Sequence, residues 1–249
     1  MNVALAAAFT APGLAVGSFL NVVAARLPLR RSLVKPRSAC MSCGTEIASR
    51  DNIPVVSYLA LHGRCRTCKA KISLRYPAVE LATGLLVGGC VLRFGLTPYA
   101  LLAAGFCVVL VVLSAIDLEL RILPDRIVLP ATVVVLLAQE IRQPSLEWPL
   151  AGLAAALFLF IAAVIYPRGM GMGDVKLMLL VGAMLGRTIA VALMIGLLSA
   201  LVPSAVLFAR HGRAARSMKI PLGPFLAVGA VVALFAGHPL LHWYLGLSK

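Results

Sequence analysis

Apolar residues follow one another along this chain in long stretches, which clusters of proline, glycine and charged residues separate. A helix needs about 20 apolar residues to cross the hydrocarbon core of a bilayer. By length and hydropathy, eight segments are candidate transmembrane helices: residues 3–25, 77–92, 98–116, 126–142, 149–166, 174–186, 188–209 and 222–243. The pattern therefore predicts an all-α polytopic membrane protein with about eight transmembrane helices.

One connection between these segments is much longer than the others. It comprises residues 26–76 and holds eleven basic and two acidic side chains, together with four cysteines. The remaining connections are short, and proline or glycine marks most of them. We therefore expect three parts: a first transmembrane helix at 1–25, a loop at 26–76, and a seven-helix membrane bundle at 77–249.

The composition agrees with lipid as the main solvent. Hydrophobic residues make up 61% of the chain and charged residues 13%, whereas a soluble globular domain carries about 25% charged residues. In a soluble protein, the net charge of +14 would suggest a nucleic-acid partner. Here the basic loop has only Tyr58 as an aromatic residue before Tyr76. Topology and anionic membrane lipid explain its charge, and no nucleic-acid partner is expected.

Basic residues also predict the orientation. The loops after the first, third, fifth and seventh candidate spans hold 19 of the 23 lysine and arginine residues. Positive charge accumulates on the cytoplasmic side, so both termini are expected outside and the 26–76 loop inside. The first span has its basic cluster behind it rather than in front, which is the opposite of a secretory signal peptide.

Four cysteines in the long loop have the spacing of metal ligands. Cys40 and Cys43 form one C-x2-C pair, and Cys65 and Cys68 form a second. Two such pairs that meet in space provide the four thiolates of a structural Zn²⁺ site. Two disulfides are the alternative, and they would require an oxidising compartment. Because the loop is expected in the cytosol, the zinc interpretation is favoured.

Two of the nine acidic residues fall at the predicted inner ends of membrane helices. Asp117 follows the third candidate span, and Asp174 begins the sixth after a glycine-rich run. Ionisable groups at that depth are functional-site candidates. If the two carboxylates meet, they cannot both ionise cheaply and they share a proton, as in an aspartic protease. The glycines before Asp174 would admit an extended substrate backbone.

Other interpretations of these acidic residues stay open at this point. Asp174 could cap its own helix, as we expect for Asp125 and Glu80, which also lie near predicted helix starts. Together with Lys176, the carboxylates could form the ion path of a transporter or channel. A non-catalytic assembly protein is a third alternative. Asp117 is the hardest to explain as a cap, because negative charge is disfavoured at the C-terminal end of a helix.

A series of motifs occurs in one order along the chain: Gly17–Val23 with Arg26-Leu27-Pro28, the two cysteine pairs around Asp51–Pro54 and Ser57-Tyr58, Arg75-Tyr76-Pro77 with Glu80, Ile116-Asp117 with Leu123-Pro124-Asp125, Gly169–Lys176, and Pro221–Phe225. On these motifs the chain resembles the bifunctional prepilin leader peptidase/N-methyltransferases of type IV pilus and type II secretion systems, also called type IV leader peptidases.

The resemblance implies a specific function. Asp117 and Asp174 match the family's catalytic pair, and Asp125 matches a position outside that pair. The substrates would be prepilins and pseudopilins, whose leader is cut at the cytoplasmic face of the bacterial inner membrane. Because the N-terminal region with the cysteines is present, the resemblance also implies methylation of the new N-terminal residue, with S-adenosylmethionine as the donor.

Overall fold

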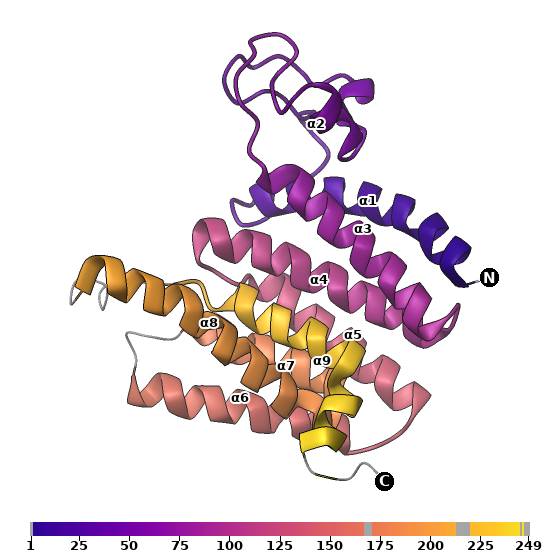
Figure 1. Cartoon of the computed structure of the whole chain (residues 1–249), viewed down its shortest axis with the longest axis vertical. Coiled ribbons are helices and arrows are strands. Elements are labelled where there is room, and N and C mark those ends of the chain that lie inside the picture. Colours follow the sequence, from indigo (N-terminus) through magenta and orange to yellow (C-terminus); the bar gives the residue numbers. More distant parts are fainter. Residues whose placement is uncertain (1, 167–170, 213–219, 245, 247–249) are drawn as a thin grey trace. The chain divides into compact units, whose positions relative to one another are not determined.

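The computed structural model describes residues 2–166, 171–212, 220–244 and 246, most of which are helical (Figure 1). The long helices are α1 (Asn2–Arg26), α3 (Arg75–Phe94), α4 (Pro98–Leu120), α5 (Asp125–Arg142), α6 (Glu147–Ile165), α7 (Met172–Leu185), α8 (Ile189–His211) and α9 (Gly223–Tyr244). The short ones are η1 (Ser49–Asn52), α2 (Val56–Ala60) and η2 (Gly186–Thr188). The described residues contain isolated β-bridges but no strand. The all-α prediction is confirmed.

Six helical stretches of the described chain are long and apolar enough to cross a membrane: Val3–Arg26, Arg75–Phe94, Pro98–Leu120, Glu147–Ile165, Met172–His211 and Gly223–Trp243. The stretch Met172–His211 contains both α7 and α8. Helix α5, which carries charged residues near both ends, is not among the six. A multi-pass membrane protein is therefore confirmed, whereas eight as the number of crossings stays a prediction.

The chain divides into two compact units, Met1–Ile116 and Asp117–Lys249. The boundary falls inside α4, so that Asp117 belongs to the second unit together with α5 to α9. The first unit contains α1, α3, most of α4 and the cysteine-bearing loop. The two predicted site regions thus belong to different units: the cysteines to the first, and both aspartates to the second.

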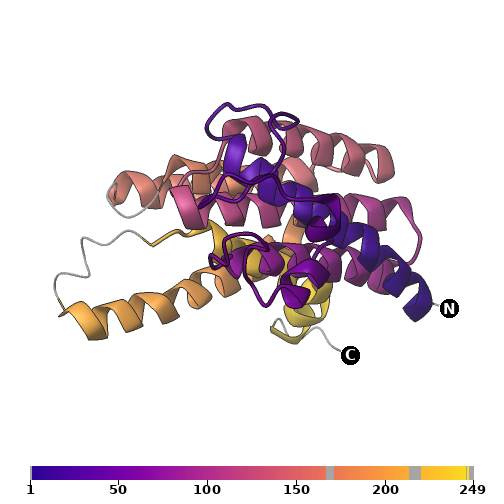
Figure 2. The ribbon, with the colours of Figure 1, turned by 90° about the horizontal axis from the view of Figure 1, so that it is seen from above.

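In the first unit, α1 lies alongside α3 (Figures 1 and 2) and the two helices meet at glycines. An ideal Cβ on Gly17 would lie 2.6 Å from the Cα of Glu80, and one on Gly13 would lie 2.9 Å from the Cα of Gly84. Small residues spaced four apart let membrane helices approach closely, and packing then replaces the hydrophobic effect, which is absent in lipid.

The second unit uses glycines in the same way. An ideal Cβ on Gly182 of α7 would lie 2.5 Å from the Cα of Gly152 on α6. A polar contact joins α5 to α7 as well, because the fully buried Gln139 donates a 2.9 Å hydrogen bond to the carbonyl oxygen of Met184. Helix α7 is therefore held on two sides, and its first turn carries Asp174.

The helix boundaries differ from the predicted ones at both aspartates. Helix α4 continues to Leu120 rather than ending at residue 116, so Asp117 lies inside its last turn. Helix α7 begins at Met172, which places Asp174 in its first turn rather than at its first residue. The predicted ends lie where the apolar residues end. The helices are longer because backbone hydrogen bonding continues beyond the apolar residues.

Replacement of Gly182 by alanine should destabilise the second unit by about 1–3 kcal/mol, because the added methyl group overpacks the contact between α6 and α7. The matched control is Gly105→Ala in α4, where an added Cβ meets nothing within 4 Å. Thermal unfolding of both variants in detergent checks this expectation. Equal midpoints for the two variants would contradict the close α6–α7 packing.

Candidate functional site

Asp117 and Asp174 come from different helices and are brought together within the second unit. Asp117 lies in the last turn of α4 and is 5% exposed, and Asp174 lies in the first turn of α7 and is 8% exposed. The two carboxyl groups are close enough for Asp117 to act electrostatically on Asp174. Two largely buried carboxylates from different helices thus lie in one region of the second unit, and their pairing stays a prediction.

Each carboxylate accepts a hydrogen bond from the backbone at a helix start. The amide of Gly223, the first residue of α9, donates to Oδ2 of Asp117 at 3.0 Å. The amide of Gly171, just before α7, donates to Oδ2 of Asp174 at 3.3 Å. A helix N-terminus carries partial positive charge and stabilises an anion. The start of α9 therefore offsets the unfavourable position of Asp117 at the C-terminal end of α4.

The capping interpretation of Asp174 describes a real contact, since its carboxylate binds the amide that precedes its own helix. Asp125 lies in the first turn of α5, as expected, but no capping hydrogen bond from it forms there. Its carboxylate binds Nζ of Lys176 at 2.7 and 2.8 Å instead. This ion pair joins the start of α5 to α7. Lys176 therefore has a fixed anionic partner, which argues against its role in an ion path.

Close packing around Leu123 brings the three segments of the site together. An ideal Cβ on Gly173 would lie 2.9 Å from the Cβ of Leu123. One on Gly223 would lie 2.8 Å from Oδ2 of Asp117 and 3.4 Å from Cδ2 of Leu123. A side chain at either position would therefore displace Leu123 or the Asp117 carboxylate. Of the glycine-rich run expected to admit substrate, Gly169 lies outside the described residues.

Gly223 is a residue of the site that the sequence analysis did not identify. The motif Pro221–Phe225 was noted for its resemblance alone, and its distance from Asp117 along the chain concealed the contact. A glycine between two prolines at the start of an apolar segment was the available signal, because such a position begins a helix and exposes an amide.

In the first unit, the four loop cysteines form one cluster. The sulfur atoms of Cys40, Cys43, Cys65 and Cys68 all lie within 4.8 Å of one another. All six cysteines of the chain are free, so the disulfide alternative is not supported. Four sulfurs at such separations can hold a single metal ion. The predicted meeting of the two C-x2-C pairs is thus found.

The two cysteine pairs lie in turns of the same construction. The amide of Cys40 donates to the carbonyl oxygen of Thr45, and that of Cys65 donates to Ala70, at 2.9 Å in both. An isolated β-bridge closes each turn. Lys69 adopts a left-handed φ of +59°, where the first turn uses glycine. This local repeat escaped the sequence analysis, because the turns share backbone geometry but few side chains.

Hydrogen bonding prepares one of the thiols for metal binding. Sγ of Cys43 and Oγ1 of Thr45 lie 3.4 Å apart. Hydrogen bonds with the side chain and the backbone of Thr45 lower the pKa of the Cys43 thiol to about 6. Metals bind the thiolate form, which a lowered pKa favours.

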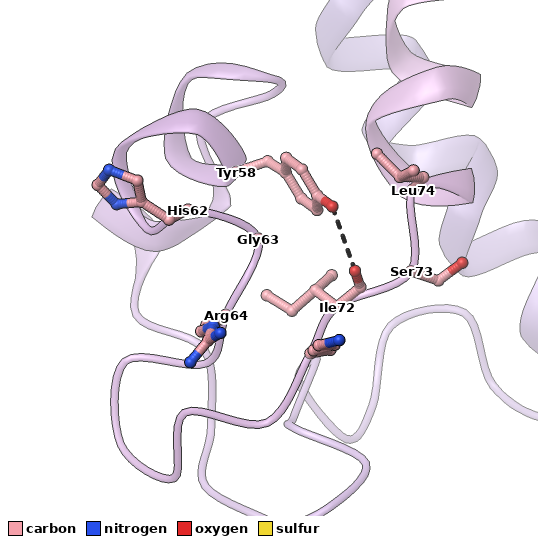
Figure 3. A pocket seen from close by; sticks show the side chains of 8 residues that line it. Tyr58, His62, Gly63, Arg64, Ile72, Ser73 and Leu74 are labelled. Carbon is pink, nitrogen blue, oxygen red and sulfur yellow. Dashed lines mark hydrogen bonds between the residues drawn. The ribbon is translucent and has the colours of Figure 1, made fainter.

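An open cavity of about 530 Å³ lies beside the second cysteine turn (Figure 3). Its lining is rich in polar and basic side chains and includes Tyr58, His62, Arg64, Lys71, Ser73 and Leu74. The hydroxyl of Tyr58 donates a 3.3 Å hydrogen bond to the carbonyl oxygen of Ile72, which joins the two sides of the loop. The cavity belongs to the first unit and contains no carboxylate.

Comparisons with known proteins match nearly the whole chain. A family model described as the bacterial peptidase A24 N-terminal domain matches residues 12–94, and one described as the type IV leader peptidase family matches residues 104–209. A curated protein of Burkholderia pseudomallei, named prepilin leader peptidase/N-methyltransferase, is 36% identical over 91% of this chain and 84% of its own. The chain belongs to the type IV leader peptidase family. The resemblance inferred from its motifs is confirmed.

Two further relatives of the chain carry the same name. The protein of Bacillus subtilis is 34% identical over 95% of this chain and 96% of its own. The protein of Pseudomonas aeruginosa is 39% identical, over 94% and 91% respectively. No solved structure matches the chain. The cysteines and the aspartates lie inside the matched segments, whereas Gly223 lies beyond the second of them.

The protein, purified without chelators, should contain about one metal ion per chain, because four clustered thiolates form a closed metal site. Replacement of Cys65 and Cys68 by serine should remove most of this metal. The matched control replaces the buried pair Cys90 and Cys107 by serine. Elemental analysis of the three proteins measures the content. Equal metal in all three would show that the loop cysteines are not the ligands.

Proposed function

We propose that this membrane protein removes the N-terminal leader from prepilins and pseudopilins and then methylates the new N-terminal residue. The observation that carries the proposal is the burial of Asp117 and Asp174, two carboxylates within electrostatic range on different helices, inside the segment that matches the type IV leader peptidase family. The names of the relatives supply the substrate class and the second activity.

Asp117 and Asp174 are the proposed catalytic pair. One carboxylate is ionised and removes a proton from a water molecule, whose oxygen attacks the carbonyl carbon of the scissile peptide. The other is protonated and donates its proton to the carbonyl oxygen. When the C–N bond breaks, the leaving amine takes up the proton gained from water. A hydroxyl group of the tetrahedral intermediate returns its proton to the other carboxylate as the new carboxyl group forms. The pair is then back to a single shared proton, so the cycle can repeat.

The backbone amides at the site would orient this pair. Gly223 and Gly171 both donate to Oδ2, one to each aspartate. With these atoms held by the backbone, Oδ1 of each side chain would bind water and substrate. Amides that are already in place need not reorganise as charge moves, and this preorganisation is a main source of enzymatic rate enhancement.

The 26–76 loop is the proposed methyltransferase-associated region. Its four cysteines would hold a structural Zn²⁺, because a closed four-thiolate site leaves no position for substrate. S-adenosylmethionine would supply the methyl group. Its transfer to the neutral α-amino group of the cleaved pilin forms a C–N bond, breaks the sulfonium C–S bond and releases one proton. The seven helices from residue 77 onward would form the peptidase bundle.

The proposed location is the bacterial inner membrane, with both termini in the periplasm and the 26–76 loop in the cytoplasm. The charge asymmetry of the loops supports this orientation, since 19 of 23 basic residues fall on one side. Membrane lipid surrounds the helices in this proposal, and no nucleic acid is needed to explain the basic loop.

The proposal predicts that Asp117→Asn and Asp174→Asn each slow leader removal by about 100- to 10,000-fold, because asparagine can neither accept the proton from water nor donate one as an acid. Mass spectrometry of a prepilin incubated with purified protein and S-adenosylmethionine measures the loss of the leader and the gain of one methyl group. Glu140→Gln, an acidic residue outside the site, is the control.

The outcomes of this experiment separate the alternatives. Leader loss without methyl gain by the wild-type protein would limit the function to a peptidase. Cleavage that survives in both aspartate variants would refute the catalytic pair. Intact prepilin in every reaction would refute the enzyme itself.

The amide of Gly223 should matter to cleavage independently of the space around it. Gly223→Ala keeps the amide but adds a Cβ, whereas Gly223→Pro adds the ring and also removes the donor to Asp117. Proline is tolerated at the first position of a helix. A hydrogen bond to a charged group is worth about 1.5–3 kcal/mol, so the proline variant should cleave roughly tenfold or more slowly than the alanine variant. Equal initial rates would contradict a role for this amide.

A further inference from the structure

The cysteine-bearing loop contains a strained turn at Val55. This residue has φ of +60° and ψ of −47°, and the amide of Val56 donates a 2.6 Å hydrogen bond to the carbonyl oxygen of Pro54. Together these features define a γ-turn of the rare, strained kind. A β-branched residue in the left-handed region is an outlier. Such strain persists only where neighbouring groups impose it, and it gathers at functional sites.

Glu80 binds the backbone of this turn at its strained residue. Its Oε2 accepts a 2.7 Å hydrogen bond from the amide of Val55. The side chain reaches the loop from α3, where Glu80 is 8% exposed. The expectation that Glu80 merely begins its helix is wrong, because the first turn of α3 holds no acidic residue. Of the three carboxylates in the first unit, Glu80 alone is buried. A buried charge of this kind requires a hydrogen-bond partner.

Contacts continue from the turn to the second cysteine pair. The hydroxyl of Ser57 donates to the carbonyl oxygen of Arg50 at 2.9 Å and accepts a hydrogen bond from the amide of Ile53 at 3.0 Å. Ser57 thus joins the segment after the turn to the segment before it. Next to Arg50, Asp51 forms a bidentate ion pair with Arg66 at 2.7 and 2.8 Å. Arg66 stands between the two cysteines of the second pair. A continuous set of contacts therefore connects α3 to the sulfur cluster.

We propose that Glu80 is a positioning residue for methyl transfer: its carboxylate holds the γ-turn at Val55 and so fixes the cysteine-bearing loop on α3. The inference rests on the proposed function, since it concerns the methyl-transfer half of that activity. Glu80 and the loop belong to the first unit, whereas Asp117 and Asp174 belong to the second. Loss of the Glu80 carboxylate therefore separates the two activities.

Substitutions of Glu80 test the inference in the full-length, purified protein. Glu80→Ala removes the acceptor and lowers kcat for methylation of a previously cleaved pilin by roughly 10- to 100-fold, the scale of a misplacement of about 1 Å. Leader removal from a prepilin stays within about twofold of wild type. Glu80→Gln retains a carbonyl acceptor and restores most of the methylation. Glu46→Ala, an exposed carboxylate of the same loop, is the matched control for charge.

A second substitution distinguishes positioning from general stability. Val55→Gly adopts the left-handed turn without strain, so in the Glu80→Ala background it recovers part of the methylation. A role in overall folding would not give this rescue. Hydrogen exchange provides a readout without activity, since the amide of Val55 and its neighbours lose protection in Glu80→Ala and keep it in Glu80→Gln and Glu46→Ala.

Three results would overturn the inference: unchanged methylation in Glu80→Ala, a parallel loss of cleavage and methylation, or unchanged exchange at Val55. Failure of the proposed function gives a different result. If the wild-type protein neither cleaves nor methylates, the proposed function is contradicted. If the wild-type protein and Glu80→Ala both cleave and methylate normally, only the inference about Glu80 is contradicted.

Discussion

The hydrogen bond from the amide of Gly223 to Asp117 joins residues that are 106 positions apart. A carboxylate at the C-terminal end of a membrane helix is unfavourable twice, because lipid excludes water and the helix end is itself partly negative. The start of α9 provides the donor and the positive end of a dipole. For this contact to form, α9 has to begin beside the end of α4, and a glycine at residue 223 leaves the Asp117 carboxylate undisplaced. The helix packing of the second unit thus brings the start of α9 to the end of α4.

Backbone amides also bind the other buried carboxylates. Asp174 accepts a hydrogen bond from the amide before its own helix, and Glu80 accepts one from an amide of the 26–76 loop. In each case a backbone donor, rather than a lysine or arginine, meets a buried carboxylate. A backbone amide satisfies the oxygen without neutralising its charge, so the group stays available for proton transfer or for holding a segment in place. Asp125, which is exposed, pairs with Lys176 instead.

Much of the fold could be predicted because lipid leaves few choices. Every backbone group of a membrane-spanning segment must be hydrogen-bonded internally, so a long apolar run predicts a helix. All eight predicted segments coincide with helices. The C-x2-C spacing likewise predicted the sulfur cluster. The contacts made by Gly223 and Glu80 could not be predicted, because they depend on how distant helices pack and leave no periodic pattern. The strained turn at Val55 could not be predicted either, because a β-branched residue prefers a negative φ and the sequence around it shows no sign of an exception.

The central claim is that two buried carboxylates act as a pair with one shared proton. The pH profile of leader removal by the wild-type protein tests it most directly. If one carboxyl must be ionised and the other protonated, the rate falls on both the acidic and the alkaline side of a maximum. A rate that rises with pH to a plateau would show that a single base is sufficient, and it would contradict the pair.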